Sequence, residues 1–226
     1  MGVPTAPVLI IAPHALDEVL GCGGTVALAA NAGAPVHVLV LFGDGTGHDA
    51  KRRIAAAAAA RILGIGDVQF AGFPENRSDT IPLSDVVTAV EKALAAIKPG
   101  TVYVVHGGNL HIDHQTAFKA TVTAVRPVPG QPVTSLYGYE VPSSTDWAPR
   151  GAGEPFLPVR YVDISRALER KRKALEAYAF ELRPVPHARS LDAVLNVAAG
   201  RGVTVGLAAA EAFTVLREIV TDGTRH

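Results

Sequence analysis

The sequence has little of several features that mark particular classes of protein. It contains a single cysteine, Cys22, which excludes an internal disulfide framework and favours a reducing compartment. Its 21 basic and 21 acidic side chains leave a formal net charge of +0, and they form no basic stripe. We therefore expect neither nucleic acid nor an anionic membrane as a partner.

Long apolar runs are also missing. The longest stretch of small residues, 55–60, lies between Arg53 and Arg61 and is too short and too weakly apolar to span a bilayer. No charged segment precedes the first apolar run, so we expect no signal peptide. These features predict a cytoplasmic protein, and they leave a homo-oligomer open.

What the sequence does have is an alternation of strand and helix patterns. Of its 226 residues 48% are hydrophobic, enough to build the core of a single domain spanning 1–226. Strands joined through helices form right-handed crossovers, so we predict a Rossmann-like α/β fold, a mostly parallel sheet with helices on both faces. The expected strands are 8–12, 36–42, 68–71 and 101–105, and the expected helices are 18–31, 49–63, 82–97 and 114–125.

The pattern changes after Pro127. Residues 133–141 and 159–164 read as strands, 190–199 as a helix, and 212–219 as either. Between them, apolar residues from Ile164 to Leu182 mark one side of a helix, and we expect its charges at 166 and 169–173 to form a solvated face. This third of the chain is expected to extend the same domain and to wall its pocket.

Two polar clusters stand where predicted strands end. His14, Asp17 and Glu18 follow the strand at 8–12, and the run 111–114, His-Ile-Asp-His, follows the strand at 101–105. Ligands of parallel sheets bind at the carboxyl ends of the strands, and catalytic zinc sites use three protein ligands. His14, Asp17 and His114 would supply two nitrogens and one oxygen. The alternative is that these are polar loop residues that cap helices.

At this point the chain resembles a known family. The run 12–25, with its His14-x-x-Asp17 spacing, and the later His111-x-Asp113-His114 are similar to the PIG-L/LmbE-like zinc-dependent N-acetyl sugar deacetylases. Shorter segments resemble a bacterial branch of that family, although the sequence alone does not place His187 and Arg189 at the zinc; the segments are 73–77, 140–145, 186–190, 201–202 and 210–213.

The resemblance implies a set of roles. One zinc ion per chain would be held by His14, Asp17 and His114. A cationic His111 would stabilise the tetrahedral oxyanion, and Asp113 would orient or charge an imidazole of its motif. The implied reaction is hydrolysis of an N-acetyl group from an amino-sugar conjugate.

One position departs from the family pattern. The family has aspartate two residues after the first histidine, where it acts as general base, and this chain has Leu16. Losing a general base typically costs about 10²- to 10⁴-fold. Three interpretations follow: Glu18 or Asp113 substitutes as base, zinc alone supports slow hydrolysis, or the chain is a non-hydrolytic zinc- or sugar-binding protein.

Other residues carry weaker signals. The Gly21-x-Gly23-Gly24 motif, with Asp44 further on, suggests nucleotide binding, but these glycines lie too far from the first strand to form its turn, so close helix packing explains them better. Cys22 is expected to be a small buried apolar residue. The candidates for substrate contacts lie in loops after the second and third strands, where salt bridges within a loop are the alternative for the last two; they are His48, Arg77 and Asp79.

Overall fold

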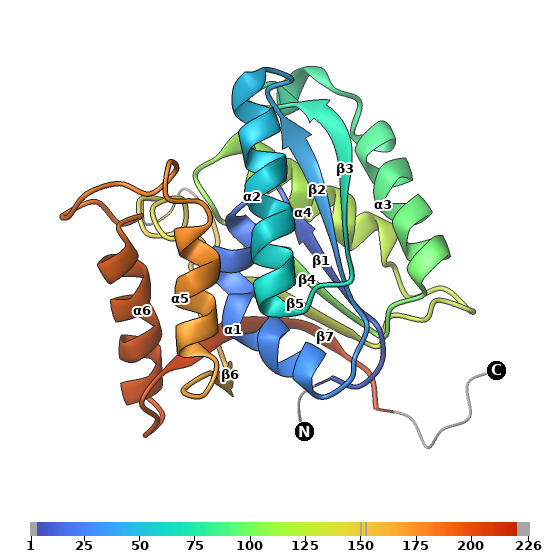
Figure 1. The fold of residues 1–226 in the computed structure, drawn as a ribbon. Coiled ribbons are helices and arrows are strands. Elements are labelled where there is room, and N and C mark those ends of the chain that lie inside the picture. The colour runs from blue at the N-terminus through green and yellow to red at the C-terminus, as the bar shows by residue number, and fades with distance from the viewer. Residues whose placement is uncertain (1–3, 150, 152, 221–226) are drawn as a thin grey trace.

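The structure confirms the predicted α/β architecture. The computed structural model describes residues 4–149, 151 and 153–220, so the predicted domain 1–226 reaches beyond the described residues at both ends. A single-domain sheet of seven strands runs in the order β3-β2-β1-β4-β5-β7-β6 (Figure 1). The strands are β1 (Val8–Ala12), β2 (Val36–Gly43), β3 (Asp67–Pro74), β4 (Thr101–Val105), β5 (Ser135–Tyr139), β6 (Arg160–Asp163) and β7 (Ala210–Glu218).

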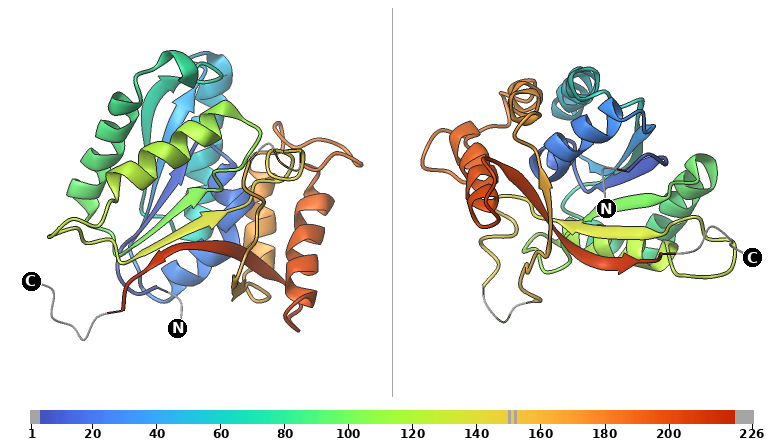
Figure 2. Two further views of the ribbon diagram at one scale, coloured as in Figure 1. Left: turned by 180° about the vertical axis from the view of Figure 1, so that it is seen from behind. Right: turned by 90° about the horizontal axis from the view of Figure 1, so that it is seen from below.

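Helices cover both faces of this sheet. On one face α1, α2 and α5 pack against one another, and on the other α3 packs against α4 (Figures 1 and 2). The helices are α1 (Asp17–Asn31), α2 (Gly47–Leu63), α3 (Leu83–Ile97), α4 (Ile112–Ala124), α5 (Leu168–Glu176) and α6 (Leu191–Val203), with a short 3₁₀ turn η1 (Ser78–Thr80). None of the helices in the described ranges combines the length and apolarity needed to cross a membrane.

The sheet brings two sequence motifs together at the carboxyl ends of its strands. Strands β1 to β5 are parallel, whereas β7 runs antiparallel to both β5 and β6. β1 pairs with β4, and every residue of both strands is buried. Because neighbouring parallel strands have their carboxyl ends on the same side of the sheet, the residues that follow β1 and β4 are neighbours in space.

Several predicted boundaries were wrong for physical reasons. β3 is longer than the predicted 68–71, because Phe73 and Pro74 also pair with β2, and no fully apolar run marks this edge strand in the sequence. The ambiguous segment 212–219 belongs to the strand β7. α4 begins at Ile112 rather than at 114, because His111 Nδ1 accepts the Asp113 N–H at 3.1 Å and caps the helix.

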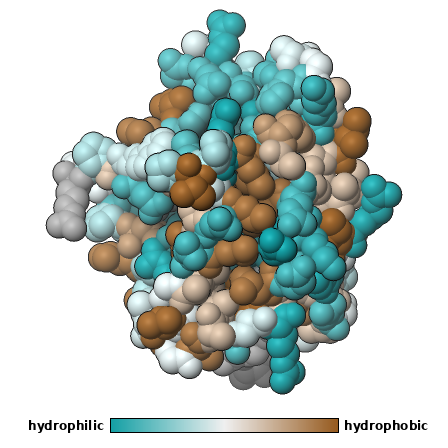
Figure 3. Space-filling view, turned by 60° about the vertical axis from the view of Figure 1, so that its left-hand side comes forward, coloured by the Kyte–Doolittle hydropathy of each residue, from teal (hydrophilic) through white to brown (hydrophobic). Residues whose placement is uncertain are grey.

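The charges of α5 do not all face solvent. Lys171 is buried, and its Nζ lies 2.6 Å from Glu211 Oε1 on β7 and donates to the Leu20 carbonyl at 2.8 Å, so this part of the prediction was wrong. Figure 3 shows apolar side chains along the middle of the molecule's α5 and α6 side, with hydrophilic ones around them.

The glycines near Cys22 serve packing. Gly21, Gly23 and Gly24 lie inside α1, so they do not form the turn of a nucleotide-binding loop. A Cβ at Gly24 would lie 2.6 Å from Ile164 Cγ2, which is too close for any side chain. Cys22 itself is buried, as predicted.

Candidate active site at the carboxyl ends of the strands

The two polar clusters converge as the fold requires. His14 follows β1 and Asp17 opens α1, while His111 precedes α4 and His114 lies in its first turn. The ring centroids of His14 and His114 are 5.5 Å apart. The 99 residues that separate His14 from Asp113 are thus bridged by the pairing of β1 with β4.

One set of three side chains fits a metal ion. Asp17 Oδ2 lies 3.5 Å from His14 Nδ1 and 3.4 Å from His114 Nε2, and the ligand atoms of the three residues lie within 4.8 Å of one another. His114 is fully buried, and its Nε2 makes no hydrogen bond within the described residues. A buried imidazole nitrogen that makes no hydrogen bond within the described residues, next to a carboxylate and a second imidazole, suits a divalent cation such as zinc.

Asp113 holds His14 rather than an imidazole of its own motif. Its Oδ2 lies 2.9 Å from His14 Nε2 and accepts the Asn76 N–H at 2.7 Å, whereas His111 Nδ1 is 4.0 Å away. Burial opposes ionisation of Asp113, but the hydrogen bonds from His14 and Asn76 outweigh it and lower its pKa to about 2. This corrects the role that the resemblance implied. Asp113 fixes the ring of His14 with Nδ1 directed at Asp17, the arrangement of a carboxylate that supports a metal-binding histidine.

His14 is strongly polarised by its two acidic neighbours. Burial disfavours its cationic form, but the hydrogen bonds with Asp113 and Asp17 prevail and raise its pKa to about 9. A metal ion at Nδ1 therefore competes with a proton there.

His111 is set up as a neutral donor. Because its Nδ1 accepts the Asp113 N–H, the neutral ring carries its proton on Nε2. Burial and the neighbouring His14 and His114 lower its pKa to about 4. A lowered pKa favours the neutral ring over the cationic one expected from the sequence, and the role of His111 at the oxyanion stays a prediction.

Leu16 sits in a strained part of the ligand loop. It is buried with φ 100°, a conformation that non-glycine residues rarely adopt. Its N–H donates to Glu18 Oε2 at 2.8 Å, and its carbonyl accepts the N–H groups of Val19 and Leu20. These bonds hold the loop that carries His14 and Asp17.

Glu18 is buried directly behind this loop. Its Oε1 accepts the Tyr178 hydroxyl at 2.8 Å, and burial raises its pKa to about 7. Two sets of side chains in the described part of the chain lie close enough to share an ion, His14 with Asp17 and His114, and His14 with His111 and Asp113. Glu18 belongs to neither set. Its role as substitute base stays a prediction.

The predicted substrate residues occupy different surroundings. His48 lies at the start of α2, and its Nε2 is 2.7 Å from Glu181 Oε1. Arg77 and Asp79 are exposed, and neither forms an ion pair with another described residue nor lines the cavity beside His111. Their proposed contacts with sugar hydroxyls stay predictions.

A cavity of about 300 Å³ opens beside His111. Its walls come from the loop after β4, the segment after β5 and the loop between α5 and α6. The lining residues are Leu110, His111, Ser143, Ser144, Trp147, Glu181, Arg183, His187 and Arg189. Sequence reasoning missed Trp147, Glu181 and Arg183, whereas the similarity of 186–190 to a bacterial branch was a usable signal for His187 and Arg189.

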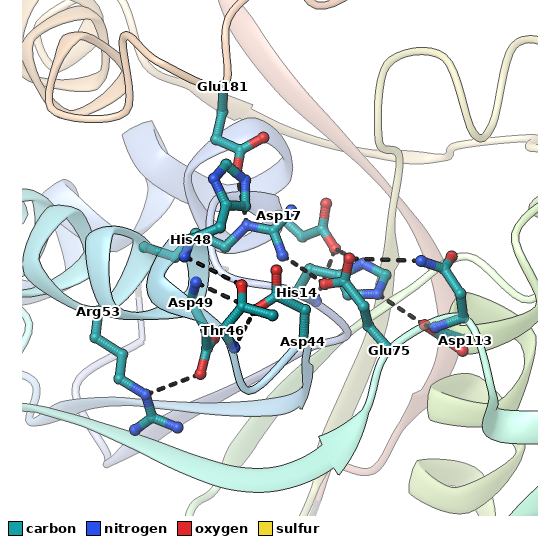
Figure 4. A network of polar contacts seen from close by, with 12 residues as sticks. His14, Asp17, Asp44, Thr46, His48, Asp49, Arg53, Glu75, Asp113 and Glu181 are labelled. Carbon is teal, nitrogen blue, oxygen red and sulfur yellow. Dashed lines mark hydrogen bonds and ion pairs between the residues drawn. The ribbon is translucent and has the colours of Figure 1, made fainter.

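A polar network joins this cavity to the metal-ligand cluster (Figure 4). Arg52 of α2 donates from Nε to Glu181 Oε1 at 2.6 Å and from its Nη1 to Glu75. Glu75 adjoins Asn76, whose N–H bonds to Asp113. Through Arg52 and Glu75, the loop between α5 and α6 is connected to the residues that orient His14. No sequence motif predicted this connection.

Comparison with known proteins agrees with this site. Residues 9–125 match the family model described as PIG-L: GlcNAc-PI de-N-acetylase. The chain is 28% identical over 144 residues to the uncharacterized deacetylase YaiS of Escherichia coli, covering 61% of this chain and 75% of that protein. It is 26% identical over 189 residues to a probable N-acetyl-alpha-D-glucosaminyl L-malate deacetylase 2 of Bacillus cereus, covering 76% and 81%.

Among solved structures, the conserved protein TT1542 from Thermus thermophilus superposes with a TM-score of 0.75 at 27% identity, covering 97% of this chain and 99% of that one. The family match spans the whole metal-ligand cluster, from His14 to His114. The chain belongs to the PIG-L family of GlcNAc-PI de-N-acetylases.

Proposed function

We propose that this chain is a zinc-dependent hydrolase that removes an N-acetyl group from an amino-sugar conjugate in the cytoplasm. The observation that carries the proposal is the set of two histidines and one aspartate, of which Asp17 and His114 are buried, with His114 Nε2 lacking a hydrogen bond within the described residues, while the neighbouring His111 lines a cavity. The deacetylase names of two relatives support the reaction type.

His14, Asp17 and His114 would hold one zinc ion per chain. When bound, zinc supplies Lewis-acid chemistry, polarising a carbonyl oxygen and lowering the pKa of water. Asp113 keeps the His14 ring in the orientation that directs Nδ1 toward Asp17.

His111 would stabilise the charge that develops on the amide oxygen. Its neutral ring donates from Nε2, and a fixed donor aimed at a developing oxyanion lowers the barrier. The N–H of Asp113 anchors the ring, so little reorganisation is needed during the reaction.

The general base is the open element of this mechanism. Leu16 accepts no proton, and Glu18 is the substitute we propose because its pKa of about 7 suits a base at neutral pH. To act, Glu18 would have to exchange its bond with Tyr178 or Leu16 for one with water. Asp113 is the second candidate, since its buried Oδ1 makes no hydrogen bond within the described residues.

Zinc quantification joined to an amine-release screen over N-acetylated sugars tests the proposal. We expect one zinc per chain and amine release, with His111→Ala retaining zinc but losing turnover. His37→Gln, a change on β2 outside the cluster, serves as the matched control and should alter neither. A purified protein that takes up no zinc would contradict the site, and loss of zinc in His111→Ala would make that residue a ligand.

A second candidate function is a zinc- or sugar-binding protein without hydrolysis. It is favoured by Leu16 at the family's base position together with the engagement of both Glu18 oxygens. Bound zinc without amine release from any conjugate would support it over the enzyme.

A further inference from the structure

The cavity beside His111 is built mainly outside the matched family segment. Apart from Leu110 and His111, all of its lining residues lie after residue 125, the end of the family match. Its volume of about 300 Å³ lies at the lower end of the range for ligand sites. His111 lines the cavity, and its ring lies beside that of the proposed zinc ligand His114. A molecule in the cavity therefore lies next to the reacting amide of the proposed function.

The charges of this cavity are unbalanced. Arg183 and Arg189 line it, and neither forms an ion pair with any carboxylate of the described residues. Arg189 Nε donates to the neutral Ser143 Oγ at 3.0 Å, which positions its guanidinium without cancelling its charge.

Glu181, the acidic residue of the lining, pairs with basic side chains outside the cavity. Glu181 Oε1 accepts from Arg52 Nε at 2.6 Å and lies 2.7 Å from His48 Nε2 (Figure 4). Arg52 and His48 belong to α2 and not to the cavity lining, and Arg52 also pairs with Glu75, so the charge of Glu181 is partly compensated from outside the cavity. Two arginines against one partly compensated carboxylate leave the lining with an excess of positive charge.

A flat aromatic wall stands beside these arginines. Trp147 is 55% exposed, and its ring lies edge-on to that of His187, with centroids 5.3 Å apart. His187 Nδ1 in turn accepts the Arg189 N–H at 2.9 Å, which fixes the imidazole. An indole face next to cationic donors suits a sugar or another ring that carries an anionic substituent.

We propose that this cavity binds an anionic group, carboxylate or phosphate, on the aglycone of the amino-sugar conjugate, with Arg183 and Arg189 as its partners. The inference rests on the proposed function for the position of the sugar. Guanidinium groups recognise both oxyanions through paired N–H donors.

Matched conjugates test this assignment. N-acetylglucosaminides with a carboxylate, a phosphate or an isosteric primary amide on the aglycone are compared by kcat/KM. We expect the anionic conjugates to exceed the amide by tenfold to about a hundredfold, the span of a hydrogen bond to a charged group. The ratio of carboxylate to phosphate identifies which oxyanion the site prefers.

The variants separate this role from a structural one. Arg183→Gln with Arg189→Gln should abolish the preference by lowering kcat/KM of the anionic conjugates to that of the amide, whereas Arg172→Gln on the outer side of α5 should leave the preference as it is. The single variant Arg183→Gln should fold normally and still reduce the preference, because Arg183 is exposed and its side chain makes no hydrogen bond or ion pair with the described residues. Equal turnover of amide and anionic conjugates, or a preference that survives both substitutions, would overturn the inference.

Calorimetric binding distinguishes failure of the inference from failure of the proposed function. If no conjugate releases amine, the proposed hydrolysis fails, and the binding data decide the cavity separately. Tighter binding of the anionic conjugates that disappears in the double variant supports the subsite. Equal binding of all conjugates contradicts it.

Discussion

Helix α1 borders two buried polar clusters that differ in how completely they are bonded. At its middle, Glu211 accepts the N–H groups of Gly24 and Thr25 at 2.8 and 2.7 Å and pairs with Lys171, which also donates to Leu20. Both charged groups of this cluster, the Lys171–Glu211 pair, have partners.

At the start of the same helix the bonding is incomplete. His114 Nε2 and Asp113 Oδ1 are buried without hydrogen bonds among the described residues. Leaving a buried polar atom unpaired costs about 1–3 kcal/mol, and at a cluster of imidazoles and carboxylates a bound metal ion would offset that cost. The first cluster pairs its charges within the fold, whereas we propose that the second completes its bonding with a metal ion, and we expect that each can be removed without the other.

The largest effect is expected from His114→Ala. Removing one of the three proposed ligands should reduce the bound zinc from one per chain to a small fraction of that amount and abolish turnover. The fold should survive, because the lost ring makes its hydrogen bond only to the Asn109 amide among the described residues. Zinc quantification and circular dichroism measure the two outcomes. Unfolding together with zinc loss would show that the cluster at the start of α1 also stabilises the fold.

Glu211→Gln should act in the opposite way. It leaves the Lys171 charge buried without its partner, which typically costs about 3–5 kcal/mol of unfolding free energy. We expect lower stability in urea with one zinc per folded chain retained. Glu176→Gln is the control, because its ion pair with Arg172 is an exposed helix pair worth about 0.3–0.5 kcal/mol. Loss of zinc from folded Glu211→Gln would show that the two clusters are coupled.

The same contrast explains what the sequence could predict. The strands 8–12 and 101–105 were correct to the residue, because short and largely apolar runs that begin after a proline or a glycine have few other solutions. The ligand cluster was predictable for a related reason: the polar motifs follow those strands directly, so parallel pairing alone brings His14 and His114 together.

Contacts between distant and irregular segments were not predictable. Lys171 read as one charge among several on a solvated face, and nothing local indicates that Glu211, 40 residues later, buries it. The bond from Asp113 to His14 spans 99 residues and crosses between motifs. The cavity walls are loops, whose positions depend on tertiary bonds such as those of Arg52 rather than on periodicity.

A smaller effect is expected at Asp113, which supports a ligand without belonging to the ligand set we assign. Asp113→Asn keeps the shape but weakens the hold on His14 Nε2, so zinc affinity should fall about 10- to 100-fold. Competition with a chelator measures the dissociation constant directly. Asp163→Asn, an exposed carboxylate bonded to Ser165, is the matched control and should not change it. An unchanged affinity in Asp113→Asn would show that the bond to His14 is incidental.

The last prediction concerns Leu16, which stands where relatives of this fold are expected to carry the base. Its φ of 100° is a strain of about 1–3 kcal/mol that aspartate tolerates better than leucine, and strain of this kind persists at functional sites. Leu16→Asp would therefore place a carboxylate between the ligands His14 and Asp17 with little backbone movement.

If no carboxylate serves as base in the wild type, this change should raise deacetylation at least tenfold, toward the roughly 10²- to 10⁴-fold contribution of a general base; with Glu18 as the base we propose, no rise is expected. Amine release by Leu16→Asp, by Leu16→Asn as the uncharged control and by Glu18→Gln measures it. A rise confined to the aspartate variant identifies the wild type as a hydrolase that lacks its base. If there is no rise, and Glu18→Gln abolishes wild-type activity, Glu18 already holds the role. If every variant binds zinc and none releases amine, the incomplete cluster at the start of α1 serves binding alone.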